Sequence, residues 1–256
     1  MSQTQFKTLL AFDCSTEVLS LALQTSDNTV HVRQLQGGAQ SSQAVLAELG
    51  ALLHEAKTPW SAVDVLVCGR GPGAFTGVRV TMAVAQGLAL ACSLPVFAVS
   101  GLLAIAEQAR VQCLEANTQH DKGADAQGSW QVLALLDARM GQMYAADCHW
   151  QAGRWQHGPE QLLDYAALAA YPGAEEKKAI AGNVRSALVT AHVALPNGRK
   201  NAPQDAQPCA AALLRVALQE IAAGAQPLTD PAALSPVYVR DKVAQTTAER
   251  AAQKTA

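Results

Sequence analysis

The residues best suited to chemistry lie in two polar turns, each of which follows an apolar run and starts with an aspartate. The turns contain Asp13, Ser15, Thr16, Asp137, Arg139 and Gly141. In some kinases such an aspartate lies near Mg²⁺ and the turn approaches the phosphates of ATP, which requires an open glycine beside it. Cys14 stands at that place in the first turn, and Ala138-Arg139-Met140 precedes the glycine of the second. Since aspartate is also a common turn former, we interpret both turns as degenerate nucleotide hairpins.

A glycine-rich stretch, GRGPGAFTGVRV at 69–80, suggests a phosphate-binding loop in front of a helix. Its candidate residues are Gly71, Pro72, Gly73, Phe75, Thr76, Gly77 and Arg79. A P-loop would need a lysine after the last glycine, where Val78 stands, and Pro72 lacks a backbone donor that a dinucleotide loop would use. We therefore expect a structural loop that sets the direction of the helix, with Thr76 or a neighbour capping it.

Metal and nucleophile chemistry find little support elsewhere in the sequence. The six histidines include no pair spaced i, i+3 or i, i+4, and the six cysteines form no CxxC motif. The sequence also lacks the GxSxG motif of a nucleophile elbow. We expect no catalytic residue, no metal site, no cofactor bound by this chain alone, and buried, reduced cysteines.

The composition predicts a globular protein of the cytoplasm. Of the 256 residues 50% are hydrophobic and 16% are charged, and the net charge is −2. No block rich in lysine or arginine is present, which argues against a protein that binds nucleic acid unaided. We expect neither a signal peptide nor a membrane span, because the first apolar run is short and no run of ~20 apolar residues free of charges and breakers follows.

Hydrophobic periodicity predicts alternating strands and helices in the first hundred residues. The expected strands are 8–12, 18–24, 29–35, 63–68 and 96–99, and the expected helices are 44–56 and 76–92. The short polar links STE and SDN join the first three strands and favour an antiparallel meander. Ser41 or Ser42 is the expected cap of the first helix, and Pro59 ends it.

A similar order recurs in the second half of the chain. The expected strands are 131–136, 142–150, 154–157 and 179–182, and the expected helices are 102–114, 160–170, 185–194 and 209–223. Two successive βββαβα units predict an α/β protein with a duplicated actin-like, ribonuclease-H-like architecture. We expect one lobe at 1–100, a second at 101–240 with a polar loop at 117–129, and a polar tail at 241–256.

The helix expected at 76–92 carries one charge, on Arg79, and is apolar on every side. We assign Val78, Met82 and Ala85 to the side that packs on the sheet. A helix without a polar side must be covered all round, either as a central core helix or by a partner protein on its outer side. The expected interface residues are Leu46, Leu49, Leu53, Val80, Ala83, Val84, Gly87 and Leu88.

Four segments together resemble the TsaB (YeaZ) family of tRNA threonylcarbamoyladenosine biosynthesis proteins. They are LLAFDCSTEVLSLAL at 9–23, GRGPGAFTGVRVTMAVAQGLALA at 69–91, LALLDARMGQMYAA at 133–146 and SPVYVRDKVA at 235–244. The combination of GPGxFTGxR with DARxGQxY is specific, and the segments span nearly the whole chain. The sequence departs from the family at Ser41-Ser42-Gln43, where a histidine usually leads into the first helix.

The resemblance implies an actin-like (ASKHA) fold and a pseudoenzyme paralogue of the catalytic subunit TsaD, whose metal-binding His-x-x-x-His pair is missing here. It implies a heterodimer with TsaD through helices of the first lobe, an ATPase partner, TsaE, and contact with tRNA only through the complex. That complex transfers a threonylcarbamoyl group to adenosine 37 of tRNAs that read codons starting with A. The resemblance leaves two questions open: whether the free protein forms a homodimer, and whether a nucleotide binds at the TsaD interface.

Two alternatives belong to other functional classes. One is an active small-molecule kinase or ATPase of actin-like fold, which turnover of ATP by the isolated protein would favour. The other is a glycoprotease-like metallopeptidase, which the missing metal ligands disfavour.

Overall fold

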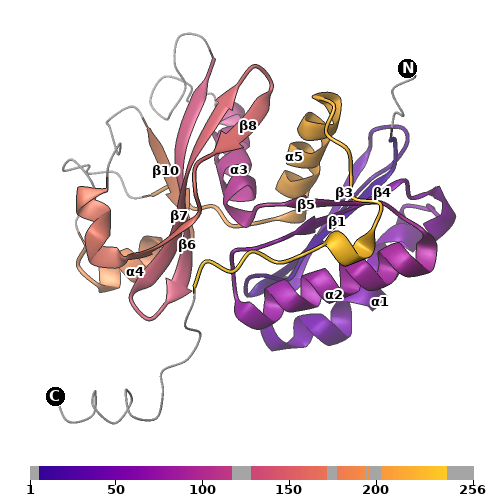
Figure 1. The fold of residues 1–256 in the computed structure, drawn as a ribbon, viewed down its shortest axis with the longest axis horizontal. Coiled ribbons are helices and arrows are strands. Elements are labelled where there is room, and N and C mark those ends of the chain that lie inside the picture. Colours follow the sequence, from indigo (N-terminus) through magenta and orange to yellow (C-terminus); the bar gives the residue numbers. More distant parts are fainter. Residues whose placement is uncertain (1–5, 117–127, 172–177, 194, 196–202, 241–256) are drawn as a thin grey trace.

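A computed structural model describes residues 6–116, 128–171, 178–193, 195 and 203–240. It has two five-stranded sheets that stand side by side with helices between and outside them (Figure 1). The strands of the first sheet are β1 (Leu9–Asp13), β2 (Val18–Gln24), β3 (Val30–Gln36), β4 (Val65–Gly69) and β5 (Val96–Val99). Their order is β3-β2-β1-β4-β5: β1, β2 and β3 form the expected antiparallel meander, and β1, β4 and β5 run parallel.

The first sheet is buried on both sides because its central strands are apolar at nearly every position. Along β1, Leu9 and Ala11 belong to the core that faces the second sheet, while Leu10 and Phe12 belong to the core under the outer helices. Successive side chains of a strand point to opposite sides of the sheet. A continuous apolar run such as LLAF therefore fits a strand covered on both sides.

Two helices cover the outer side of the first sheet, and two lie between the sheets (Figure 1). The outer helices are α1 (Ser41–Glu55) and α2 (Phe75–Cys92), and the inner ones are α3 (Gly101–Glu115) and α5 (Ala210–Ala222). The expected caps of the outer helices are wrong. The cap positions are Gln40 and Ala74, neither of which makes a side-chain cap bond. Ser100 caps α3 instead, accepting hydrogen bonds from the N–H groups of Leu102 and Leu103.

The second sheet repeats part of this pattern. Its strands are β6 (Trp130–Arg139), β7 (Gln142–Gln151), β8 (Arg154–His157), β9 (Gln161–Asp164) and β10 (Ala179–Gly182). The order β8-β7-β6-β10, with β10 parallel to β6 and the other pairs antiparallel, matches β3-β2-β1-β4. A short helix, α4 (Arg185–Thr190), follows β10. The predicted loop at 117–129 and tail at 241–256 lie almost wholly outside the described residues.

The helix expected at 160–170 is absent. The segment instead forms β9, which pairs with β7, and a 3₁₀ turn at Tyr165–Ala170. Both β8 and β9 lie on the same edge of β7, and Pro159 stands between them. Because proline has no N–H to give to a ladder, it interrupts what would otherwise be one longer edge strand.

The helix α2 is, by length and composition alone, apolar enough to cross a membrane. A share of 33% of this helix is buried in the structure, and core helices of other folds can be equally long and apolar. Val78, Met82 and Ala85 are buried against the sheet, as expected. The hydroxyl of Thr81 accepts a hydrogen bond from the N–H of Cys14 at 3.0 Å. The second turn of α2 is therefore bonded to the aspartate turn that follows β1.

The C-terminal segment 228–240 runs from one sheet to the other. It bridges the edge of β5 at Val96, passes over α2, and ends beside the β6–β7 turn (Figure 1). The amide of Gln86 on α2 donates to the carbonyls of Pro231 and Leu234, and the N–H of Val237 donates to the carbonyl of Arg70. This segment includes a 3₁₀ turn at Pro231–Ala233.

Candidate functional site: a cleft between the two aspartate turns

The two aspartate turns, the glycine-rich loop and the C-terminal segment meet at one cleft of about 220 Å³. Thr16 and Glu17 line it from the first turn, and Asp137 and Arg139 line it from the second. The elements that sequence analysis singled out separately therefore belong to one site. Asp13 is not among the residues that line it.

Asp13 turns inward, away from the cleft, and is 1% exposed. One carboxylate oxygen accepts hydrogen bonds from the N–H and the hydroxyl of Ser15, at 2.7 and 2.6 Å. The other oxygen lies beneath Gly69, where an added β-carbon would stand 1.7 Å away, and has no hydrogen-bond partner. Burial raises the pKa of Asp13 to about 6, although the bonds from Ser15 oppose that shift. A carboxylate in this position stabilises the turn and is not accessible to a metal ion in the cleft.

The glycines of the loop make room for the first turn. A β-carbon on Gly73 would stand 2.7 Å from the carbonyl oxygen of Ser15, and one on Gly77 would stand 2.0 Å from that of Cys14. The N–H of Ala74 donates to the carbonyl of Ser15 at 2.8 Å. The glycine pattern is thus explained by close packing of the start of α2 on the first turn.

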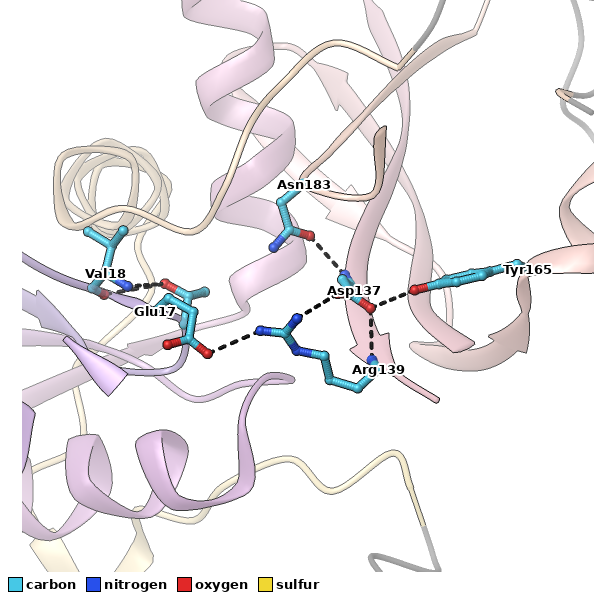
Figure 2. A network of polar contacts seen from close by, with 7 residues as sticks. Glu17, Val18, Asp137, Arg139, Tyr165 and Asn183 are labelled. Atoms are coloured by element: carbon cyan, nitrogen blue, oxygen red, sulfur yellow. Dashed lines mark hydrogen bonds and ion pairs between the residues drawn. The ribbon is translucent and has the colours of Figure 1, made fainter. Parts of the chain in front are cut away.

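The second turn is organised around Asp137 (Figure 2). One oxygen of its carboxylate accepts hydrogen bonds from the N–H of Arg139 at 2.8 Å and from the hydroxyl of Tyr165 at 2.7 Å. The N–H of Asp137 donates to the side-chain oxygen of Asn183 at 2.8 Å. Burial, followed by the hydrogen bond to Asp137, raises the pKa of the Tyr165 hydroxyl. The turn itself needs left-handed backbone at Arg139, Met140 and Gly141, of which only the glycine adopts it without strain.

Arg139 joins the two turns across the cleft (Figure 2). Its guanidinium donates to the carboxylate of Glu17 at 3.1 Å and lies 3.6 Å from the second oxygen of Asp137. The side chains of Arg139 and Glu17 are 70% and 76% exposed, so solvent screens this pair. A phosphate entering here would have to compete with two carboxylates for the same guanidinium.

The C-terminal segment closes one side of the cleft. Arg240 donates to the carbonyl of Ala138 at 3.0 Å and to the side chain of Gln142 at 2.8 Å. Tyr238 packs against Phe75 with ring centroids 5.9 Å apart, and Arg79 lies 3.7 Å over the Phe75 ring. Phe75 and Arg79 thus hold this segment, a role that the structural-loop interpretation did not foresee.

Sequence analysis missed several residues of this site. They are Glu17, Tyr165, Asn183, Tyr238 and Arg240. Tyr238 and Arg240 lie in the segment SPVYVRDKVA, which carries part of the family resemblance but suggests no role for either residue by itself. Among the described residues no three histidine, cysteine, aspartate or glutamate side chains gather in a way that could hold a metal ion.

The outer side of α1 and α2 forms a second candidate site. Leu46 on α1 is 52% exposed and Leu90 on α2 is 77% exposed, and Ala83 and Gly87 of α2 are also exposed. We call Leu46, Ala83, Gly87 and Leu90 the outer apolar face. Val80, Val84 and Leu88 are partly buried and contact the core under the helices. Leu49 and Leu53, which were expected at an interface, are 0% and 2% exposed and belong to that core, because they lie on the side of α1 that packs on the sheet.

Comparison with known proteins gives one consistent family. Residues 28–252 match the family model described as "TsaD: tRNA N6-adenosine threonylcarbamoyltransferase". The chain is 35% identical over 152 residues to "tRNA threonylcarbamoyladenosine biosynthesis protein TsaB" of Escherichia coli K12, covering 59% of each chain. It is 37% identical over 137 residues to the Haemophilus influenzae protein of the same name, covering 54% of this chain and 52% of that one. These matches thus span little more than half the length of the curated relatives.

A solved structure extends the comparison to nearly the full chain. "YeaZ from Pseudomonas aeruginosa" superposes with a TM-score of 0.72 and is 32% identical. The match covers 91% of this chain and 99% of that one.

Proposed function

The chain belongs to the TsaB (YeaZ) family of TsaD-type domains, and from this premise we propose that it is a noncatalytic subunit of a tRNA-modifying complex. The complex would transfer a threonylcarbamoyl group to adenosine 37 of tRNAs that read codons starting with A. The names of the relatives, which refer to tRNA threonylcarbamoyladenosine biosynthesis, support this assignment. The recurring strand order β8-β7-β6-β10 supports descent from a duplicated actin-like lobe.

The geometry of the cleft supports a noncatalytic role. An actin-like kinase would need an aspartate open to Mg²⁺ and a free cation for phosphate. Here Asp13 is bonded to Ser15 and buried, and Arg139 already contacts Glu17 and Asp137. These residues do not fit a magnesium–phosphate group in the arrangement that they adopt. We therefore assign no reaction and no cofactor to this chain alone.

The observation that carries the proposal is the outer apolar face on α1 and α2. Leu46 and Leu90 are the most exposed large apolar side chains of these two helices. Ala83 and Gly87, which lie at helical spacing from Leu90 on α2, would let a partner backbone approach closely. Exposed apolar patches commonly mark protein–protein contacts. We assign this face to the catalytic subunit TsaD, with a homodimer of the free protein as a competing use of the same surface.

The remaining partners follow from this assignment. TsaE would join the complex as its ATPase, and tRNA would be held mainly by the other subunits because this chain has a net charge of −2. A complex of this kind acts in the cytoplasm.

Gly87→Arg tests the interface with little risk to the fold. An added β-carbon at Gly87 has no atom within 4 Å, and arginine favours a helix more than glycine does. Val84, in contrast, contacts the core, so a charge there would confound folding with binding. We expect Gly87→Arg to keep its melting temperature and to lose co-purification with co-expressed TsaD by 100-fold or more, since an unpaired charge in an apolar interface costs about 3–5 kcal/mol.

Ser186→Arg is the matched control, because it adds the same charge at an exposed position on α4 of the other half. It should bind TsaD like the unaltered protein. If Gly87→Arg folds and binds TsaD normally, the interface lies elsewhere and the assignment of the outer apolar face is wrong.

A further inference from the structure

A hollow of about 280 Å³ lies at the β5 edge of the first sheet, and it shares no lining residue with the cleft or the outer apolar face. Arg70 and Ala98 line it from the ends of β4 and β5. Gln226, Leu234 and Ser235 line it from the C-terminal segment. Its size is just below the ~300 Å³ that marks the lower end of pockets for drug-sized ligands. It therefore suits a small group or the end of a chain.

The backbone of β5 offers unpaired hydrogen-bonding groups to this hollow. The carbonyl of Pro95 accepts from the N–H of Leu66 in β4 and that of Val99 accepts from the N–H of Arg70 just after β4, so these positions face the inside of the sheet. Val96 faces outward and exchanges two hydrogen bonds with Leu228, each 2.8 Å long. Since strand positions alternate, the N–H and C=O of Ala98 also face outward. The next pair of that short antiparallel ladder would be Ala98 with Gln226, but among the described residues the hydrogen bonds of the ladder end at the Val96–Leu228 pair.

Arg70 supplies an unpaired cation at the same place. Its Nε atom is buried and has no hydrogen-bond partner, and no ion pair joins it to any described acidic residue. A buried donor without an acceptor costs free energy that a ligand can recover. The acceptor that best matches a guanidinium is a carboxylate, because it can accept two parallel bonds.

We propose that this hollow binds the C-terminal end of another polypeptide. The terminal carboxylate pairs with Arg70, and the last amide group pairs with the outward N–H and C=O of Ala98. A small apolar last side chain packs on Leu228, which lines the hollow and is 39% exposed. Leu228 shows that this edge already accepts an antiparallel segment one pair away. The combination of a strand edge with a carboxylate-binding group is a known mode of recognising chain ends.

The test uses two probes that differ only in the carboxylate. Acetyl-seryl-valine and its C-terminal amide are titrated into the full chain, and the backbone N–H signal of Ala98 is followed by NMR. We expect the acid to bind with a Kd of about 1 mM and the amide at least 10-fold more weakly, because a charge-assisted bond to Arg70 is lost. Equal binding of the two probes, or no saturable shift with either, would overturn the proposal.

Two variants locate the site. Arg70→Gln should weaken binding of the acid at least 10-fold, whereas Arg185→Gln, which removes the same charge at an exposed position on α4, should leave it unchanged. Ala98→Pro removes the outward N–H at an edge-strand position, where proline is tolerated, and should also weaken binding; an unchanged melting temperature shows that the ring has not disturbed the strand. Normal affinity in both Arg70→Gln and Ala98→Pro would refute the assignment.

Discussion

The α-carbon of Gly77 lies so close to the carbonyl oxygen of Cys14 that a β-carbon on Gly77 would be 2.0 Å from it. The same contact is supported by the hydrogen bond from the N–H of Cys14 to the hydroxyl of Thr81, one turn further along α2. The first turn of α2 and the first aspartate turn are therefore one packed unit. The glycine-rich loop owes its composition to this contact.

Gly77→Ala should consequently destabilise the protein by about 1–3 kcal/mol or more, because the obstructing atoms are backbone and have little room to move. Gly87→Ala is the matched control on the same helix, since its β-carbon would meet no atom within 4 Å. There the gain in helix propensity should raise the free energy of unfolding by up to about 1 kcal/mol. Chemical denaturation measures both, and effects of the same sign would contradict the packing argument.

Local patterns in the sequence were enough to predict most of the elements. The strand at 18–24 and the strand at 96–99 have the predicted bounds, because their apolar runs end at polar or proline-bounded links. The segment 160–170 was mistaken for a helix because Leu162, Leu163 and Leu168 do not distinguish a helix from an edge strand and a turn. Its state is decided by pairing with β7, which lies elsewhere in the chain.

The candidate site was predictable in part, for the same reason. The two aspartate turns follow strands and are visible as motifs, but their contact across the cleft depends on Glu17 and Arg139, which are 122 positions apart. Asp13 and Asp137 look alike in sequence, yet one is buried under Gly69 and the other faces the cleft. Only the packing of α2 and of the C-terminal segment separates their roles.

Glu107 should be essential for stability, although it takes no part in either candidate site. Its carboxylate is fully buried between the sheets and accepts hydrogen bonds from Arg110 at 2.9 and 3.0 Å and from the indole of Trp155 at 2.8 Å. Arg215 of α5 lies 3.3 Å away. Glu107→Gln would leave these guanidinium groups without their anion, so we expect a loss of about 3–5 kcal/mol in the free energy of unfolding.

Glu55→Gln serves as the control for that change. Glu55 is also a helical glutamate paired with an arginine, Arg33, but its side chain is 61% exposed. We expect a loss below about 1 kcal/mol there. Similar losses in the two variants would show that burial does not set the value of the Glu107 contacts.

The purified protein alone should neither turn over ATP nor retain stoichiometric zinc or iron. The physical reasons are the inward orientation of Asp13 and the pairing of Arg139 with Glu17. Phosphate release assays and elemental analysis check the two expectations. One metal ion per chain, or ATP turnover that Asp13→Ala abolishes, would contradict the noncatalytic assignment.

The buried carboxyl of Asp13 should make the protein more stable at mildly acidic pH than at neutral pH, relative to a variant that cannot titrate there. Burial raises the pKa of Asp13 from 3.8 to about 6, so the folded state holds this proton more tightly than the unfolded state. The resulting stabilisation is complete below about pH 4 and is lost as the pH rises through about 6, a change of about 3 kcal/mol. Asp13→Asn keeps an oxygen for Ser15 and removes the titration. Urea denaturation of both proteins between pH 4 and 7.5 measures the free energy of unfolding of each. As the pH rises, the unaltered protein should lose free energy of unfolding relative to Asp13→Asn. Parallel pH curves for the two proteins would mean that Asp13 titrates as an ordinary carboxyl.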